Sequence, residues 1–458
     1  MNTEILKKIN AEWLLEKTLP SLVRRDAPGI ALEQSSDNVI TVAGPGSLWE
    51  PPGLHAPGAP GSSDIIAVAG PRRAGKTWYL YQLIQDLLTS GKARREDILF
   101  VDFEDYRLTD FKATDTDALL AAFQQVAGKP PSFLFFDEVQ QLPDWSRVLR
   151  TLHNQNRYRI AVSGSNSHLL EREISSELRG RCRNILILPF SFPEILRYDG
   201  IPYDDRTLLT PARGQVIMTF DRYLKEGGFP EVLKRETAME KRELLQTYYR
   251  TIYYRDILER YNIKAKYVLE AVMSYSLNTF SDLFSISSFG KHLKQHQLPG
   301  SKQTISNYLR YLQEAFFIIA HDKYSYSARR RIMNPKKIYL LDTGFSSLAA
   351  DFSENRGKLL ENVVAVELFR RRAESFYYKG KGECDFIVMG AVKPETAIQV
   401  CWEMTPKNEG REIRGLRDAM SALAIRDGLI LTYNEEGERI VADVGKIPVI
   451  PVWKWLLA

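Results

Sequence analysis

The sequence predicts an α/β fold built on a parallel sheet, and three features of the chain lead to this prediction. Short apolar runs alternate with amphipathic helical stretches between residues 64 and 200, as expected for strands joined by right-handed helical crossovers. A glycine-rich turn separates the first apolar run from the first helical stretch. The pattern becomes helical after residue 200 and returns to mixed helices and strands near residue 346. We therefore expect a parallel α/β domain followed by further folded units.

The length and composition indicate a globular protein with several domains. The chain has 458 residues, and a prior of roughly one domain per 150 residues suggests about three. Hydrophobic residues make up 44% and charged residues 26% of the chain, which is typical of globular proteins in water. No apolar run approaches the roughly 18 residues of a membrane helix, and charges interrupt the N-terminal apolar residues, unlike in a secretory signal. We expect a cytoplasmic protein without membrane segments.

The cysteines and the net charge point to no special class. The net charge of +5 is too small to indicate a partner, because a basic binding surface depends on clustering and not on the total. The three cysteines are widely separated and form no CxxC pair, so neither a disulfide framework nor a zinc site is expected. They are Cys182, Cys384 and Cys401.

The predicted elements follow one another along the chain. Residues 1–17 have helical spacing, whereas residues 44–63 are so rich in Pro and Gly that they are expected to form a loop. Hydrophobic periodicity separates the strands from the helices in the segment that follows. Strands are expected at 65–70, 98–104, 132–138, 159–165 and 184–190, helices at 77–91, 115–127 and 144–155, and a mainly helical block at 201–265.

The turn GPRRAGKT at residues 70–77 matches the pattern G-x-x-x-x-G-K-[ST], for which average residue frequencies predict only about 0.01 chance matches in a chain of this length. Its glycines permit a sharp path, and the backbone N–H groups at the start of the following helix favour phosphate. Lys76 is expected to reach the β- and γ-phosphates of ATP, and the Thr77 hydroxyl to ligate Mg²⁺. The predicted nucleotide-binding residues are Gly70, Pro71, Arg72, Arg73, Ala74, Gly75, Lys76, Thr77 and Asp137.

The run FLFFDE at residues 133–138 places two carboxylates directly after four apolar residues. A buried parallel strand of this kind delivers its last side chains to the edge of the sheet where ligands bind. Asp137 is expected to hold the Mg²⁺ hydration shell, and Glu138 to orient and polarise the attacking water. The pair predicts a hydrolase.

Polar residues follow the next strand, IAVSGS, where this architecture places a sensor of the γ-phosphate. Ser165 or Asn166 would serve as that sensor, while Ser163 lies just before them. A simple helix cap before HLLEREI is the alternative interpretation.

Arginines follow in the short run ELRGRCRN, which contains Arg179, Arg181 and Arg183. An arginine that reaches a neighbouring subunit's nucleotide accelerates hydrolysis by roughly 10³ to 10⁵. This interpretation predicts a homo-oligomer, and a solvated basic turn is the alternative.

Several of these motifs together resemble the AAA+ domain of a large prokaryotic ATPase family, in which that domain precedes a region long described only as a domain of unknown function. The first half contributes GPRRAGKTWYL, LFFDEVQQLPDW, AVSGSNSHLL, ELRGR and LPFSFPEIL. The second half contributes GGFPEVL, YYRDILERY, KIYLLDTGF, LLENVVAVEL, ECDFIV, AIQVCWE and IPVWKWLL. The likeness extends from about residue 64 to the end. It implies an AAA+ core at 64–200, a helical lid at 201–265, a winged-helix module at 266–345 and a restriction-endonuclease-like α/β domain at 346–458. The N-terminal helix and Pro/Gly-rich segment at 1–63 precede the resemblance, and the Pro/Gly-rich part departs from the usual short N-terminal helix of the family.

The helix predicted from SKQTISNYLRYLQEAFFII suits the recognition helix of a winged helix-turn-helix that binds DNA. Basic residues concentrate between positions 286 and 337, as phosphate contacts require. A winged helix that binds a protein partner through a solvated basic face is the alternative. The predicted nucleic-acid contacts are Lys302, Gln303, Thr304, Asn307 and Arg310 on the helix, with Arg329, Arg330 and Arg331 on the wing.

The resemblance to restriction-type nucleases implies a metal held between carboxylates, with a lysine two residues after the last of them. Glu361 and Asp385 match this pattern, but Gln399 is followed two residues later by Cys401 in place of lysine. A neutral thiol lacks the positive charge that stabilises a developing hydroxide. We therefore expect a nuclease-like site that is weak or inactive, with active metal-dependent cleavage as the alternative.

These features together predict an oligomeric AAA+ ATPase that binds Mg²⁺ and ATP and acts on DNA. The competing hypothesis is a nucleotide-dependent switch or scaffold that binds a protein and no nucleic acid.

Overall fold

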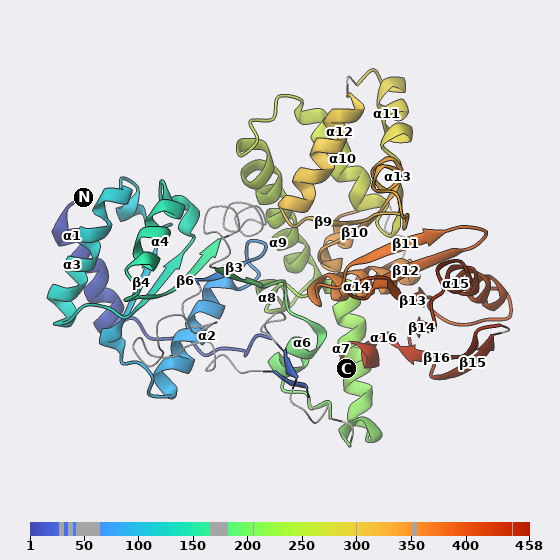
Figure 1. Ribbon diagram of the computed structural model, residues 1–458, viewed down its shortest axis with the longest axis horizontal. Helices are drawn as coiled ribbons and strands as arrows, with labels where there is room; N and C mark the ends of the chain where they lie inside the picture. Colours follow the sequence, from blue (N-terminus) through green and yellow to red (C-terminus); the bar gives the residue numbers. More distant parts are fainter. Residues whose placement is uncertain are drawn as a thin grey trace. The chain divides into compact units, whose positions relative to one another are not determined.

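The computed structural model (Figure 1) forms two compact units, Met1–Leu188 and Pro189–Ala458. No helix in the described part of the chain is long and apolar enough to cross a membrane. The structure describes residues 1–26, 32–34, 40–42, 65–164, 182–204, 206–298, 300–349, 355–441 and 443–458.

A five-stranded parallel sheet forms the centre of the first unit, with strand order β4-β5-β6-β3-β7. Because all five strands run the same way, their carboxyl ends share one edge. Strand β6 lies between β3, which precedes the glycine-rich turn, and β5, which ends in Asp137. The strands are β3 (Ile65–Ala69), β4 (Ile98–Asp102), β5 (Phe133–Asp137), β6 (Arg159–Gly164) and β7 (Cys182–Leu186).

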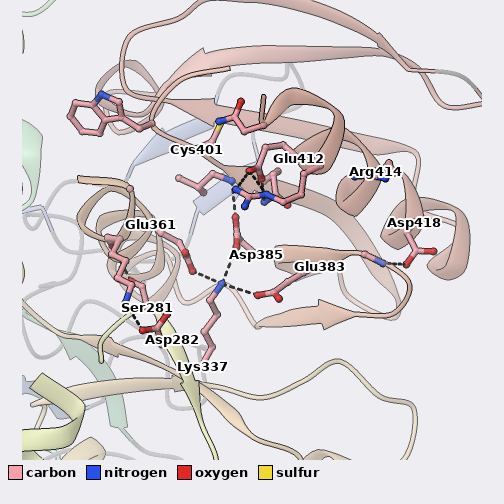
Figure 2. A pocket seen from close by; sticks show the side chains of 18 of the residues that line it. Ser281, Asp282, Lys337, Glu361, Glu383, Asp385, Cys401, Glu412, Arg414 and Asp418 are labelled. Atoms are coloured by element: carbon pink, nitrogen blue, oxygen red, sulfur yellow. Dashed lines mark hydrogen bonds and ion pairs between the residues drawn. The ribbon is translucent and has the colours of Figure 1, made fainter. Parts of the chain in front are cut away.

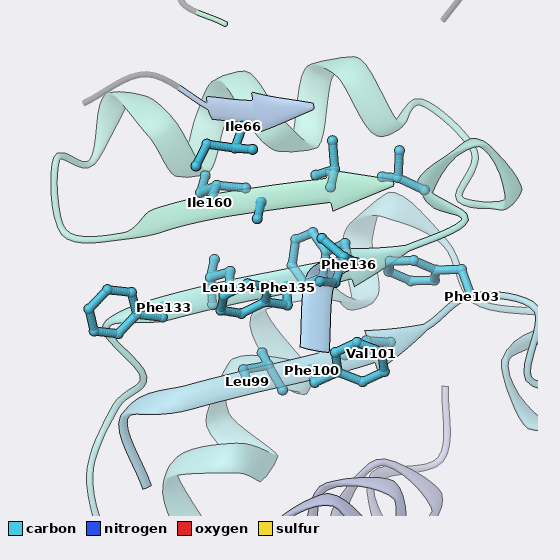
Figure 3. Packing of buried hydrophobic residues seen from close by; sticks show 14 of the residues in the cluster. Ile66, Leu99, Phe100, Val101, Phe103, Phe133, Leu134, Phe135, Phe136 and Ile160 are labelled. Carbon is cyan, nitrogen blue, oxygen red and sulfur yellow. The ribbon is translucent and has the colours of Figure 1, made fainter. Parts of the chain in front are cut away.

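Helices follow β3, β4 and β5 in the sequence and lie beside the sheet (Figure 1). Every residue of β5 is buried, which explains why its sequence is continuously apolar and does not alternate. Figure 3 shows Phe133, Leu134, Phe135 and Phe136 lying between the side chains of the neighbouring strands. The helices are α2 (Lys76–Thr89), α3 (Thr116–Ala127) and α4 (Trp145–Asn154).

The N-terminal segment packs onto this domain. It begins with α1 (Thr3–Ala11), continues as a π-helical turn (Glu12–Glu16), and α1 packs against α3. The Trp13 indole N–H donates to the Ile98 carbonyl at 2.7 Å and its ring stacks on Phe100. Further along, β1 (Leu32–Gln34) pairs antiparallel with β2 (Ile40–Val42). The predicted Pro/Gly-rich loop at residues 44–63 lies outside the described residues.

The second unit begins with helices and continues into a small antiparallel sheet of order β8-β10-β9. A short helix, α13 (Ala328–Met333), lies in the connection from β9 to β10. The opening helices are α6 (Phe192–Tyr198), α7 (Ala212–Glu226), α8 (Pro230–Leu233) and α9 (Ala238–Thr251), which continues as a π-helix (Ile252–Glu259). The next elements are α10 (Lys266–Asn278), β8 (Asp282–Phe284), α11 (Ile286–Gln295), α12 (Lys302–Glu314), β9 (Ile318–His321) and β10 (Lys336–Leu340).

A six-stranded mixed sheet completes the second unit, with order β11-β12-β13-β14-β16-β15. Its β13–β14 and β14–β16 pairs are parallel, and the others are antiparallel. Helix α15 packs against β12 and β13. The strands are β11 (Ser375–Lys379), β12 (Glu383–Met389), β13 (Pro394–Val400), β14 (Asp427–Thr432), β15 (Gly437–Val441) and β16 (Gly445–Pro451). The helices are α14 (Arg356–Arg370), α15 (Glu409–Leu423) and α16 (Val452–Trp455).

Candidate functional site

The glycine-rich turn connects β3 to α2, and its two glycines are required by its path. Gly70 has φ +151°, and a Cβ at this position would lie 1.8 Å from the Ile187 carbonyl oxygen. Gly75 has φ +98° immediately before α2. Both backbone conformations are ones that side-chain-bearing residues rarely adopt. The turn can therefore pass close to the end of β7 and enter the helix sharply.

The start of α2 presents backbone N–H groups that could bind an anion. No side chain of the described residues caps this N-terminus, so its first N–H groups have no partner within the helix. Such a helix end attracts phosphate through these N–H groups and through the helix dipole. The buried Lys76 ammonium donates to the Pro71 carbonyl at 3.2 Å and lies 3.6 Å from a Glu138 carboxylate oxygen.

Asp137, at the end of β5, is held by two hydroxyl groups. The Thr77 hydroxyl donates to one carboxylate oxygen at 2.7 Å, and the Ser163 hydroxyl donates to the other. Burial raises the pKa of Asp137 to about 6, although both hydroxyl groups act in the opposite direction. A hydroxyl and a carboxylate oxygen side by side are ligands that Mg²⁺ prefers. Thr77 and Asp137 therefore fit a magnesium ion.

Glu138 has a left-handed backbone with φ +48°, a conformation that costs energy in a residue other than glycine. Its N–H donates to the Ser163 hydroxyl at 3.1 Å. The Gln140 side-chain amide donates to the Glu138 carboxylate. Ser163 therefore holds both acids of the pair.

Arg25, which the motif analysis missed, supports the turn from the N-terminal segment. The residue is only 6% exposed, and its guanidinium donates to the Ala74 carbonyl at 2.6 Å and the Leu188 carbonyl at 2.5 Å. Its own N–H donates to the Gln82 side chain at 2.8 Å. Arg25 thus joins the glycine-rich turn to the end of β7. The one feature of the sequence that could have indicated this contact is the adjacent pair Arg24 and Arg25.

The other residues predicted for this site are placed as follows. Arg72 forms an ion pair with Glu104 at 3.2 Å, and Arg73 has φ +66°. Neither Ser165 nor Asn166, the predicted sensors, lies within the described residues. Arg179 and Arg181 lie outside them as well.

Helix α12 buries one face and exposes the predicted DNA-contacting residues on the other. Ile305, Tyr308, Leu309 and Leu312 are buried, and the Ser301 hydroxyl caps the helix by accepting the Thr304 N–H at 3.0 Å. Lys302, Gln303 and Arg310 are exposed, and Asn307 and Thr304 are partly exposed. Gln303 donates to Asn307 at 3.1 Å, and Arg310 lies 3.6 Å from Glu314.

The basic segment after β9 differs from a simple wing. Arg329, Arg330 and Arg331 lie on α13, and the Arg331 guanidinium stacks over the Phe376 ring with 5.5 Å to its centroid. Lys336 forms an ion pair with Asp322, and Lys337 is buried. Some basic residues of the cluster between positions 286 and 337 are therefore engaged in contacts within the unit.

Lys337 stands at the centre of a second candidate site in the second unit (Figure 2). Its ammonium lies 2.8 Å from Glu361, 2.9 Å from Asp385 and 3.5 Å from Glu383. Burial alone would lower the pKa of Lys337, but the charges of Asp385 and Glu361 raise it well above its usual range. Burial and the charge of Asp385 raise the pKa of Glu361 to about 7. Sequence reasoning missed Lys337 because it lies on β10, far along the chain from these acids.

Gln399 and Cys401 are the remaining positions of the predicted nuclease-like site. Glu361, Asp385 and Gln399 line one cavity of about 900 Å³. The Gln399 amide nitrogen donates to Glu412 at 2.7 Å. Burial raises the pKa of the Cys401 thiol to about 12, so this side chain is neutral, and it contacts Met404. Among the described residues, no three His, Cys, Asp or Glu side chains are arranged to hold a metal ion.

Comparison with known families assigns two regions of the chain. The model of an AAA domain matches residues 62–196, and the model of a domain of unknown function (DUF8612) matches residues 217–356. The first match contains the glycine-rich turn and the acidic strand.

Two relatives align with 86% of the chain, and one solved structure aligns with 62% of it. An uncharacterized protein of Haemophilus influenzae is 27% identical over 397 residues, which cover 86% of this chain and 94% of that protein. The Walker-type ATPase PABY2304 of Pyrococcus abyssi covers 62% of this chain and 90% of its own, with 13% identity and a TM-score of 0.40, too low to indicate a shared overall fold. The uncharacterized protein MJ1544 of Methanocaldococcus jannaschii is 33% identical over 404 residues, which cover 86% of this chain and 88% of that protein. The chain therefore belongs to the family of MJ1544, a family of AAA-type ATPases in which a domain of unknown function follows the AAA domain.

Proposed function

We propose that the first unit binds ATP with Mg²⁺ and hydrolyses it. The observation that carries this proposal is the group formed by Thr77, Asp137, Lys76 and Glu138 at the carboxyl edge of the sheet. Lys76 and the first N–H groups of α2 would bind the phosphates, and Thr77 with Asp137 would hold the metal. Magnesium, when bound there, neutralises negative charge on the phosphates.

The contacts of Lys76 suggest how binding prepares the catalytic acid. The Lys76 ammonium lies between the Pro71 carbonyl and the Glu138 carboxylate. Phosphate oxygens form stronger, charge-assisted hydrogen bonds with an ammonium than a neutral carbonyl does. When Lys76 turns to the phosphates, the Glu138 carboxylate loses this cation and is free to accept a proton from water. Gln140, which donates to the other Glu138 oxygen, keeps that side chain oriented.

Two substitutions separate binding from hydrolysis. Lys76→Ala should abolish nucleotide binding, whereas Glu138→Gln should bind ATP with nearly wild-type affinity and lose hydrolysis. Glu96→Gln, at an exposed acid of the same unit, is the matched control and should leave both unchanged. Calorimetric titration with a slowly hydrolysed ATP analogue and phosphate release measure the two steps. Normal turnover by Glu138→Gln would contradict the assigned role.

The second part of the proposal is that the ATPase acts on DNA through a winged helix. Helix α10, strand β8, helices α11 and α12, and the pair β9–β10 follow one another in the order of that module. In this interpretation α12 is the recognition helix, with Lys302 and Arg310 exposed on its free face. DNA should then stimulate ATP hydrolysis.

The double substitution Lys302→Ala/Arg310→Ala should reduce stimulation by duplex or forked DNA while the basal rate stays unchanged. Lys393→Ala/Arg426→Ala removes two exposed charges from strands or loops elsewhere in the same unit and is the charge-matched control. An ATPase rate that does not respond to DNA in wild type would favour the alternative, a nucleotide-dependent switch that binds a protein partner.

A further part of the proposal concerns Arg179 and Arg181. These arginines would complete the hydrolytic site of a neighbouring copy of the chain. A charge that reaches a neighbour's phosphates would make activity depend on oligomerisation. Mixing Arg179→Ala/Arg181→Ala with Glu138→Gln should then restore part of the activity that each variant lacks alone. Mixtures with no more activity than their components would contradict this arrangement.

A further inference from the structure

The cavity around Lys337 carries chemistry that ATP hydrolysis does not use. Its volume is about 900 Å³, within the range of clefts that enclose small ligands or part of a larger one. Six basic and six acidic side chains line it, so the formal charges cancel. The arrangement of the ion pairs therefore decides which charges remain available to a ligand.

The acidic side chains are engaged within the cavity. Lys337 contacts Glu361, Asp385 and Glu383 at once, and the remaining acids have partners of their own. Asp282 pairs with Lys358, Glu412 pairs with Arg411, and Asp418 accepts the Gly382 N–H. Figure 2 shows the Lys337 ammonium in the space between the carboxylates. A divalent cation would have to displace this ammonium, which is fixed on β10, to reach them.

Three cations of the cavity remain available. Lys381, Arg414 and Arg417 are exposed and form no ion pair with any described residue. Arg411, Arg414 and Arg417 follow at three-residue spacing on α15, so they lie along one side of that helix. A row of this kind matches successive phosphates of a strand.

The wall of the cavity contains an unsatisfied hydrogen-bond acceptor. Gln399 is 5% exposed, and its Oε1 has no hydrogen-bond partner in the described structure. The Glu412 carboxylate accepts from the Gln399 nitrogen, which fixes the amide orientation and leaves the oxygen as the free group. A buried acceptor without a partner costs about 1 to 3 kcal/mol. This oxygen is covered in the structure, so a ligand's donor would reach it after a small movement of the side chain.

We propose that this cavity binds a single strand of nucleic acid and holds it without cleavage, with Lys337 in the place that a divalent ion would take among the carboxylates. The strand's phosphates match Lys381, Arg414 and Arg417. Its base amino groups or sugar hydroxyls supply the donor that Gln399 lacks, which an inorganic anion with acceptors alone does not. The proposal concerns the second unit and does not depend on ATP hydrolysis.

The first test measures binding of a short fluorescein-labelled single-stranded oligonucleotide to the whole chain by fluorescence anisotropy, without nucleotide and with EDTA. Three phosphate contacts give a salt slope of about −2, so affinity should fall about 20-fold between 50 and 200 mM salt. Arg414→Ala/Arg417→Ala should reduce the slope to about −0.7 and weaken binding by at least about tenfold. The matched control, Lys393→Ala/Arg426→Ala, should bind like wild type.

Several outcomes of this test would overturn the proposal. Unchanged affinity in Arg414→Ala/Arg417→Ala would show that the strand binds elsewhere. If Lys302→Ala/Arg310→Ala alone removed binding, the winged-helix proposal would stand and this one would fall. A strict requirement for Mg²⁺, or cleavage of the oligonucleotide by wild type in Mg²⁺, would show that a metal and not Lys337 acts among the carboxylates.

The second test asks whether Lys337 excludes a metal. In an Asp137→Asn background, which removes the carboxylate proposed to hold the metal of the nucleotide site, titration calorimetry with Mn²⁺ should detect no site, and the further change Lys337→Ala should create one. Mn²⁺ binding in the presence of Lys337 would contradict the proposal, as would its absence in a folded Lys337→Ala variant. If that variant does not fold, strand binding by wild type in EDTA decides the matter.

Discussion

Single side chains of the first unit connect parts of the nucleotide site that are distant along the sequence. The Ser163 hydroxyl donates to the Asp137 carboxylate and accepts the backbone N–H of Glu138, so one small residue positions both acids. Arg25 plays the same part for the glycine-rich turn, which it joins to the end of β7. These contacts support the residues that would touch the nucleotide. We expect them to influence the affinity for nucleotide by fixing the shape of the turn.

Arg25→Ala should weaken nucleotide binding by at least about tenfold, because it removes two hydrogen bonds from a buried charged group, each worth about 1.5 to 3 kcal/mol. Arg24→Ala is the matched control. Arg24 is largely exposed and pairs with Asp86 at 3.3 Å, a surface contact worth about 0 to 1 kcal/mol. Titration calorimetry with an ATP analogue compares the two. Equal affinities would show that Arg25 has no influence on the turn.

The raised pKa of Asp137 predicts a pH-dependent cost to the nucleotide-free fold. Because burial raises this pKa from 3.8 to about 6, ionisation is harder in the folded state, and stability falls as the pH rises between these values. Over the whole interval the loss is about 3 kcal/mol. Asp137→Asn lacks this cost, so its stability relative to wild type should improve from pH 4 to pH 7. Urea unfolding at both pH values measures the difference, and a constant difference would refute the prediction.

Whole elements of the second unit depend on close backbone approaches that glycine permits. Gly227 ends α7 with φ +73°, and a Cβ there would lie 1.7 Å from an Asp342 carboxylate oxygen. The same carboxylate accepts the N–H groups of Gly228 and Gly344, so it joins the end of α7 to the segment after β10. This explains why the motifs GGFP and LLDTGF, distant in sequence, both contain glycine at the point of contact.

Gly227→Ala should destabilise the second unit by at least about 2 kcal/mol, from a strained backbone together with displacement of Asp342. Gly410→Ala serves as the control in the same unit. A Cβ at Gly410 meets nothing within 4 Å, and in the first turn of α15 alanine should stabilise by about 0.5 to 1 kcal/mol. Urea unfolding of both variants, followed by fluorescence, distinguishes the two effects. Similar shifts in both would contradict the proposed role of the Gly227 contact.

The whole molecule consists of two compact units, and the two candidate sites lie in different ones. The described residues of the proposed nucleotide site belong to Met1–Leu188, and the residues that line the cavity around Lys337 belong to Pro189–Ala458. Each site can therefore be changed by substitution without altering the residues of the other.

A nucleotide should stabilise the unit that binds it. At a ligand concentration of about 100 times Kd, binding adds about 2.7 kcal/mol to the stability of the folded form. Differential scanning calorimetry should show an Mg²⁺-dependent upward shift of one transition with an ATP analogue, and no shift in Lys76→Ala. An identical shift of the entire unfolding profile would show that the two units unfold together.

The sequence by itself predicted the alternation of strands and helices, and it contained the short motifs. The turn at residues 70–77 and the acids at the end of β5 are contiguous runs, and their order along the chain predicts a nucleotide site. Helix α12 was equally predictable, because its buried residues recur at helical spacing. The segment predicted as a wing contains the helix α13, and the stacking of Arg331 on Phe376 there depends on a neighbouring strand that the local sequence does not reveal.

The contacts of Arg25, Ser163 and Lys337 needed the folded chain. Arg25 lies 49 residues from Ala74, and Lys337 lies 48 residues from Asp385. Periodicity states which face of an element is buried, but it does not state which other element packs there. The missing lysine after Gln399 therefore suggested an absent charge, whereas strand pairing and packing bring an ammonium to the carboxylates from β10.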